Sequence, residues 1–181
     1  MNPNPAARNR RWLTALAVVF AVIGMASWLR PETLAPIIDV RFPDIEWVDT
    51  ETLSQSMQAP GSAAPLLLDV RSEEEFAVSH LRGAVRVEPG QRSFVSLPLD
   101  RDTTVVVYCS VGYRSAAIVE ALRASGVSEV RNLTGGIFAW ANEGRPVFKN
   151  DQPAVTVHPY DQIWGLLLRD DLHDQRQRDA P

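Results

Sequence analysis

Short segments with the pattern of buried strands alternate with segments of helical pattern between residues 44 and 150. The strand-like runs are rich in leucine and valine, and a capping box from Ser72 to Glu75 marks the start of a helix. This alternation predicts an α/β fold with an open parallel sheet flanked by helices. We expect five strands, at 45–48, 66–70, 84–87, 103–108 and 130–133, and helices that begin at 49 and 72 or cover 115–125 and 137–141.

Cys109 directly follows one of these strands and is the only cysteine of the 181 residues. A lone thiol excludes an internal disulfide and any multi-cysteine zinc or iron–sulfur site. In an open parallel sheet, the active site lies beyond the carboxyl ends of the strands. Loop N–H groups and the amino end of the next helix can converge there on an anion and favour a thiolate. We therefore expect a nucleophile; the alternative is an inert buried thiol.

The loop after Cys109 contains a glycine and an arginine that suit such a role. Gly112 supplies the backbone freedom that a tight loop needs. Arg114 adds a fixed positive charge that is expected to bind an anionic substrate through two hydrogen bonds.

This loop is one of four motifs that resemble those of the single-domain rhodanese-like sulfurtransferases. The resemblance covers roughly residues 44–148, and the motifs follow one another in the same order. Those proteins share a D-x-R…E-F/Y signature, an H-I-x-G-A turn, an active loop C-x-x-G-x-R-S and a closing L-x-G-G-x-x-x-W…P-V element. The matching residues are Leu68-Asp69-Val70-Arg71 with Glu75-Phe76, His80-Leu81-Arg82-Gly83-Ala84, Cys109 with Gly112-Tyr113-Arg114-Ser115, and Leu133-Thr134-Gly135-Gly136 with Trp140 and Pro146-Val147.

The resemblance implies a rhodanese-like fold and sulfur transfer in two displacements. Cys109 would take a sulfane sulfur from a donor such as thiosulfate and hold it as a persulfide, which cyanide or a biological thiol then collects. Backbone N–H groups of residues 110–114 would surround the terminal sulfur, and Arg114 would steer an anionic donor. No cofactor or metal is implied. The substrate-binding residues would be Ser110, Val111, Gly112, Tyr113, Arg114 and Ser115.

Other motif residues are expected to support the site: Asp69, Arg71, Glu75, His80, Gly135 and Gly136. We expect Arg71 to pair with Glu74 or Glu75; the alternative is that Asp69 and Arg71 bind substrate. His80 is expected to be a hydrogen-bonded turn residue rather than a proton shuttle.

The glycine pair Gly135-Gly136 predicts a tight turn near the active loop. The hydroxyl groups of Ser110 and Ser115 have two open roles, either a hydrogen bond to the persulfide or a cap on the helix.

The length of the cysteine loop separates sulfur chemistry from phosphate chemistry. From Cys109 to Arg114 the loop has six residues, whereas tyrosine phosphatases, cell-cycle phosphatases and arsenate reductases use seven. Six residues suit a single sulfur atom better than a tetrahedral oxyanion. The remaining alternative is a non-catalytic module that binds a partner or senses oxidants through Cys109.

The amino-terminal segment has the pattern of a membrane anchor. A basic region, residues 1–11, precedes an uncharged run at 12–29, which as a helix reaches about 27 Å. We expect an uncleaved signal anchor that leaves the following domain outside the cytoplasm, in the periplasm if the source is bacterial. A cleaved signal that releases a secreted protein is the first alternative, and a buried core helix is the second.

The segments that flank the predicted domain, residues 44–150, carry weaker patterns. Residues 30–43 contain three prolines and are expected to be a linker with little regular structure. In the extension, residues 151–181, apolar residues between 163 and 172 recur near helical spacing. We expect one helix that packs on the domain; a membrane-surface or partner-binding helix is the alternative.

Charge and cysteine content also define the expected partners. A net charge of -4 and an isoelectric point near 5.4 exclude a typical nucleic-acid binder. The expected partners are a small sulfur donor, a thiol or cyanide acceptor, and the membrane. Because an exported thiol is exposed to oxidation, a protein sulfur acceptor or a thiol reductant is a further partner class.

Overall fold

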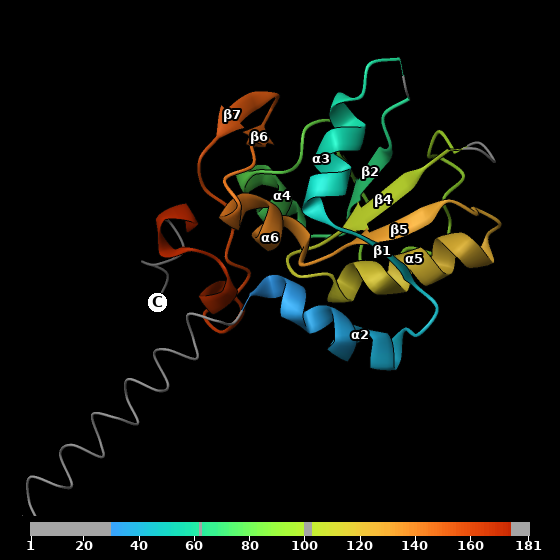
Figure 1. Cartoon of the computed structure of the whole chain (residues 1–181), viewed down its shortest axis with the longest axis horizontal. Helices are drawn as coiled ribbons and strands as arrows, with labels where there is room; N and C mark the ends of the chain where they lie inside the picture. Colours follow the sequence, from blue (N-terminus) through green and yellow to red (C-terminus); the bar gives the residue numbers. More distant parts are fainter. Residues whose placement is uncertain (1–29, 62, 100–102, 175–181) are drawn as a thin grey trace, which may run out of the picture. The chain divides into compact units, whose positions relative to one another are not determined.

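A computed structural model describes residues 30–61, 63–99 and 103–174. Five strands form one parallel sheet in the order β1-β5-β4-β2-β3 (Figure 1). The strands are β1 (Glu46–Val48), β2 (Leu66–Asp69), β3 (Val85–Arg86), β4 (Val105–Tyr108) and β5 (Val130–Leu133). The predicted five-stranded parallel sheet is therefore confirmed.

Strand β4 lies at the centre of this sheet, between β2 and β5. All four of its side chains are buried, which explains its continuous run of valine in the sequence. Val105 and Val107 contribute to one hydrophobic cluster, and Val106 and Tyr108 contribute to another on the opposite face. The residue after β4, Cys109, is thus fixed by a strand that is held on both edges and both faces.

Helices cover both faces of the sheet. They are α3 (Thr50–Gln58), α4 (Glu73–Val78), α5 (Tyr113–Ala124) and α6 (Gly136–Asn142). Helix α5 lies on one face, and α3, α4 and α6 lie on the other (Figure 1). The start signals read from the sequence are present, because the Asp49 side chain accepts the Thr52 N–H at 2.7 Å and Ser72 and Glu75 form a complete capping box.

The prediction of a linker at 30–43 is wrong. The segment forms the 3₁₀ helix η1 (Pro31–Leu34) and the helix α2 (Ala35–Arg41), which lies on the same face as α5 (Figure 1). Pro36 occupies the first turn of α2, where proline needs no N–H partner and does not break a helix. Ile38 and Phe42 then bury their side chains in the core.

The prediction of one helix in the carboxyl-terminal extension is also wrong. Strands β6 (Val147–Lys149) and β7 (Gln152–Ala154) form a hairpin, followed by two short 3₁₀ helices, η2 (Trp164–Leu167) and η3 (Asp170–Leu172). The Asp161 side chain accepts the N–H groups of Ile163 and Trp164, as a helix cap does, but the backbone is extended at Leu168, so η2 ends after about one turn.

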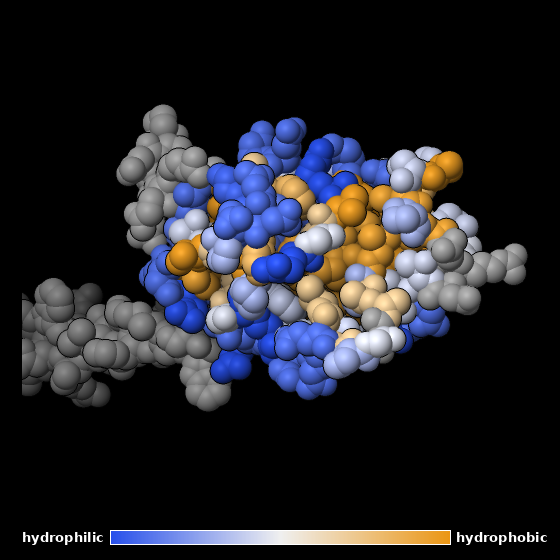
Figure 2. Space-filling view, turned by 90° about the horizontal axis from the view of Figure 1, so that it is seen from above, coloured by the Kyte–Doolittle hydropathy of each residue, from blue (hydrophilic) through white to orange (hydrophobic). Residues whose placement is uncertain are grey.

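The extension nevertheless packs on the domain, as expected. Val157 and Leu168 are buried in the hydrophobic cluster that covers the α6 face of the sheet. Figure 2 shows a face on which a large hydrophobic area lies beside hydrophilic residues, with smaller hydrophobic spots elsewhere.

The predicted membrane anchor at 12–29 lies outside the described residues. Within the part of the chain that the structure describes, no helix has both the length and the apolar character needed to cross a membrane.

Candidate active site

Cys109 lies at the carboxyl end of β4 and its side chain is buried, with 1% exposed. Its sulfur accepts the N–H of Gly112 at 3.2 Å. The N–H groups of Tyr113, Arg114 and Ser115 belong to the first turn of α5 and have no carbonyl acceptor within that helix. The Gly112 N–H is therefore directed at the sulfur, and the amino end of α5 follows directly in the chain.

Gly112 is required by the shape of this loop. Its φ of 105° lies in the left-handed region, where a side chain is strained. A Cβ at this position would also lie 3.2 Å from the Trp47 ring. The Asn132 amide donates to the Gly112 carbonyl at 2.8 Å, so β5 holds the loop from the side.

Helix α6 holds the other side of the loop. The N–H of Ile137 donates to the Cys109 carbonyl at 2.9 Å, and that of Phe138 donates to the Ser110 carbonyl at 3.1 Å. A Cβ on Gly136 would collide with both carbonyl groups. Gly135 and Gly136 both have positive φ, so the tight turn that the sequence predicts next to the active loop is present.

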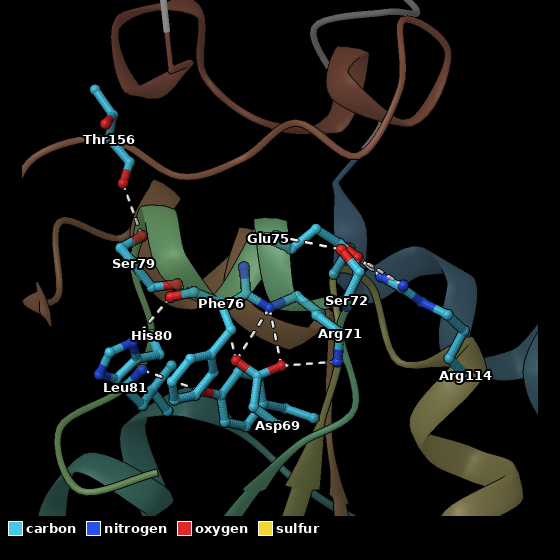
Figure 3. Close-up of polar contacts among 12 residues, drawn as sticks. Asp69, Arg71, Ser72, Glu75, Phe76, Ser79, His80, Leu81, Arg114 and Thr156 are labelled. Carbon is cyan, nitrogen blue, oxygen red and sulfur yellow. Dashed lines mark hydrogen bonds and ion pairs between the residues drawn. The ribbon is translucent and has the colours of Figure 1, made fainter. Parts of the chain in front are cut away.

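Arg114 does not present a free guanidinium for an anion, contrary to the sequence-based expectation. Its Nη1 and Nη2 atoms donate to the two carboxylate oxygens of Glu75 at 2.8 and 2.7 Å. Ser110 donates to Glu75 at 3.0 Å and accepts from Arg114 at 2.9 Å. The Tyr160 ring covers the guanidinium face at 4.6 Å. Figure 3 shows the Glu75 and Arg114 side chains directed toward each other.

The electrostatics of this pair follow from its burial and its hydrogen bonds. Burial alone would raise the pKa of Glu75, but the hydrogen bond and charge of Arg114 outweigh it and lower that pKa to about 2. Burial alone would lower the pKa of Arg114. The hydrogen bond to Glu75 and the charge of Cys109 act in the opposite direction and raise this pKa above its ordinary value. Both groups therefore stay ionised at neutral pH.

Arg71 pairs with Asp69, not with Glu74 or Glu75 as the sequence suggested. Its Nη2 atom lies 2.6 Å from Asp69 Oδ2 and also donates to the Ser79 carbonyl at 2.6 Å (Figure 3). The two side chains are fully buried, and they tie the end of β2 to the residues after α4. This arrangement is structural, because neither group reaches the surface.

His80 also has a structural position. Its ring stacks on Phe76 at a centroid distance of 4.0 Å, and its Nδ1 lies 3.1 Å from the Phe76 carbonyl oxygen. Its backbone N–H donates to Phe148 at 2.8 Å. The turn thereby joins α4 to β6, which agrees with the structural interpretation of this histidine.

Ser110 and Ser115 differ in their contacts. The Ser110 hydroxyl is engaged by Glu75 and Arg114. The Ser115 side chain is fully buried, and among the described residues its hydroxyl has no hydrogen-bond partner. Neither hydroxyl caps α5, since the residue at its N-cap is Gly112 and no side chain bonds there.

A cavity of about 290 Å³ lies over the active loop. Most of its lining is aliphatic or aromatic. The lining residues are Leu34, Ile37, Ile38, Cys109, Ser110, Val111, Tyr113, Arg114, Tyr160 and Trp164.

A family model described as "Rhodanese-like domain" matches residues 49–143, more than half of the chain. The chain belongs to the rhodanese-like family. The fold agrees with this assignment: the Pseudomonas aeruginosa thiosulfate sulfurtransferase superposes with a TM-score of 0.55 at 20% identity, over 67% of this chain and 23% of that one. The rhodanese-like domain of the Anabaena Alr3790 protein gives 0.52 at 25% identity, over 58% and 80%.

Similar sequences of the rhodanese-like family include enzymes and longer proteins. A protein named "Sulfurtransferase" from Allochromatium vinosum is 36% identical over 104 residues, 55% of this chain and 92% of that protein. Uncharacterized protein slr1261 of Synechocystis is 31% identical over 62% of each chain. The probable adenylyltransferase/sulfurtransferase MoeZ of Mycobacterium tuberculosis is 37% identical over 44% of this chain, and the match spans only 21% of MoeZ.

Half of the cavity lining comes from outside the rhodanese-like match. Residues from η1 and α2 and from the segment around η2 form these walls: Leu34, Ile37, Ile38, Tyr160 and Trp164. The family motifs carry no signal for them. The apolar pattern between 163 and 172 marked Trp164 as a packing residue, but nothing in the sequence placed it beside Cys109.

Proposed function

We propose that this rhodanese-like protein is a sulfurtransferase that carries a sulfane sulfur as a persulfide on Cys109. The observation that carries the proposal is the loop geometry, in which the buried sulfur accepts the Gly112 N–H and faces the first turn of α5. An anionic terminal sulfur would find donors there without moving the backbone. The sulfurtransferase names of similar proteins support the same class of reaction.

The proposed reaction has two displacements at sulfur. The Cys109 thiolate attacks the sulfane sulfur of the donor, a new S–S bond forms, and the donor bond breaks with its electron pair on the leaving group, which is sulfite when thiosulfate is the donor. A thiol or cyanide then attacks the outer sulfur of the persulfide. The bond to Cys109 breaks, and the thiolate is restored.

The chain's own residues would assist these steps by position rather than by proton transfer. The Glu75–Arg114 pair fixes both ends of the loop, since Glu75 also holds Ser110. Ser115, whose buried hydroxyl has no partner among the described residues, is the side chain best suited to bond the persulfide.

Steady-state sulfur transfer tests this proposal. The full chain is expected to form thiocyanate from thiosulfate and cyanide, and to form sulfide when dithiothreitol replaces cyanide. The Cys109→Ser protein is expected to lose this activity by about three orders of magnitude or more, because the covalent route is lost. Equal activity in the two proteins would contradict the proposal.

We further propose that the domain is held at a membrane, outside the cytoplasm, by the segment at 12–29. The basic residues before this uncharged run support the proposal. Protease added to spheroplasts, in which an outer membrane no longer shields the periplasm, is expected to digest the domain. Protection until the membrane is lysed would contradict it.

A further inference from the structure

We propose that the sulfur compounds that react with Cys109 carry an uncharged, apolar organic body, as aryl and alkyl thiosulfonates or persulfides do, in preference to the hydrophilic dianion thiosulfate. This inference rests on the proposed sulfur transfer and names its substrate class. The cavity over the active loop, with its lining from η1, α2 and the segment around η2, carries the argument.

The charge around this cavity gives the first reason. Of the described residues that line it, only Arg114 carries a positive charge, and its two terminal nitrogens already bond Glu75. Tyr160 covers the face of the same guanidinium. A dianion that enters would lose its water without meeting an unpaired positive charge, which is unfavourable in a buried site.

The walls give the second reason. Ile37 and Trp164 line the cavity yet remain 67% and 38% exposed, so their apolar surface is in contact with water when the cavity is unfilled. An apolar substrate would remove that surface from water. The volume, about 290 Å³, is near the lower limit of small-molecule pockets and suits one ring or a short alkyl chain.

Tyr160 shows that this side of the cavity is held in place. Its φ of 69° is in the left-handed region, which is unusual for an aromatic residue. Its N–H donates to Nδ1 of the buried His158 at 2.9 Å, and its ring stacks on Arg114. Strained residues that a structure holds firmly tend to belong to functional sites.

The chemistry is the same first displacement with a different leaving group. For a thiosulfonate, the Cys109 thiolate forms an S–S bond to the terminal sulfur, and the S–S bond of the donor breaks. The electron pair leaves with the sulfonyl group as a sulfinate. For a persulfide, the leaving group is a thiolate that takes up one proton.

Paired donors test the inference. Methanethiosulfonate and benzenethiosulfonate have the same charge and reacting atoms, and differ in their apolar body. With dithiothreitol as acceptor, we expect kcat/KM to be about tenfold higher for benzenethiosulfonate, because it buries more apolar area. This ratio is first divided by the ratio of the rates at which the two donors react with free glutathione, which removes the difference in their intrinsic reactivity. Thiosulfate is expected to be the poorest of the three. Equal values, or a preference for thiosulfate, would overturn the inference.

Two substitutions on α2 locate the effect. Ile37→Ser removes an apolar wall and is expected to reduce the benzene-to-methane ratio about threefold or more. Val40→Ser is the matched control, because Val40 is 87% exposed on the same helix and is not among the lining residues. A ratio that falls equally in both variants, or in neither, would contradict the assignment of the wall.

Equilibrium binding separates this inference from the proposed reaction. Calorimetry of the Cys109→Ser protein with benzenesulfinate and methanesulfinate measures the preference without any sulfur transfer. Tighter binding of benzenesulfinate supports an apolar cavity whether or not any donor loads Cys109. A failure of every donor to load Cys109 would refute only the proposed reaction. Equal affinities would refute the inference itself.

Discussion

Glu75 determines the chemistry available at the active loop because it holds Arg114 and Ser110 together. The family motif identifies all three residues in the sequence. Their pairing is not readable there, because it depends on β2 and β4 being neighbours in the sheet, which brings the amino ends of α4 and α5 together, and Glu75 and Arg114 are 39 positions apart in the chain. The sequence therefore predicts the residue types of the site but assigns the wrong partners to Arg114 and Arg71.

Replacing Glu75 with Gln leaves a guanidinium with a neutral partner in a half-buried position. We expect Glu75→Gln to lower the free energy of unfolding by about 2–4 kcal/mol, measured by urea denaturation. Glu74→Gln is the control, because Glu74 is the exposed neighbour on the same helix and should change the value by less than about 0.5 kcal/mol. Equal effects in the two variants would show that the pair does not stabilise the loop.

The same carboxylate predicts an acid-sensitive step. The folded pKa of Glu75, about 2, lies below its ordinary value of 4.5, so its contribution is complete above pH 4.5 and is lost as pH falls through about 2. Urea denaturation at several pH values should show a steeper decline between these limits for the wild type than for Glu75→Gln. Parallel curves would contradict the assignment.

Gly136 offers a test of the contact between α6 and the active loop. A methyl group there would strike the Cys109 and Ser110 carbonyls, so Gly136→Ala is expected to cost about 3 kcal/mol or more of stability and to slow sulfur loading. Gly144 also has a positive φ, but open space surrounds it, so Gly144→Ala should show the backbone strain alone, about 1 kcal/mol. Matching losses would mean that the collision is absent.

At the scale of elements, the sequence predicts the strands and the helices α3 to α6 of the domain well, and the segments before and after the domain poorly. The central strands β2 and β4 are nearly continuous apolar runs because both faces of the sheet are covered there, a pattern that is visible in single sequences. Helix α2 was missed because its prolines resemble those of a linker, whereas they occupy helix starts. The spacing in the extension predicts one helix, but the backbone becomes extended at Leu168, so only the short helices η2 and η3 form.

The extension is expected to loosen at mildly acidic pH. Burial lowers the pKa of His158 below its ordinary value of 6.5, and its Nδ1 must stay unprotonated to accept the Tyr160 N–H. Its contribution is therefore complete above pH 6.5 and is lost as pH falls below that value. The protection factor of the Tyr160 amide, in which the exchange rate is corrected for the pH dependence of intrinsic exchange, should fall over this range.

A substitution without a titrating group is the control for this pH effect. An asparagine side chain can still accept the hydrogen bond through its oxygen, so in His158→Asn the protection factor should stay constant between pH 6.5 and 5. The same fall in protection in this variant would assign the effect to another group.

At the scale of the whole molecule, the family domain and its flanking segments contribute differently. Residues 49–143 supply four of the five strands, the cysteine loop and the residues that hold it, and the residue types of the site were predictable because each motif is a short run of sequence. The cavity over Cys109 was not, since it forms only when two segments from opposite ends of the described chain reach the loop. The proposed substrate preference therefore depends on tertiary structure that no motif encodes.

The most direct test of the central claim is the intact mass of the protein after exposure to sulfane-sulfur donors. The full chain, treated with thiosulfate or benzenethiosulfonate and desalted, is predicted to gain about 32 Da, one sulfur atom, on Cys109. Dithiothreitol should then remove that mass as sulfide, and Cys109→Ser should gain nothing. An unchanged mass with both donors, or a gain that persists in Cys109→Ser, would contradict persulfide transfer through this cysteine.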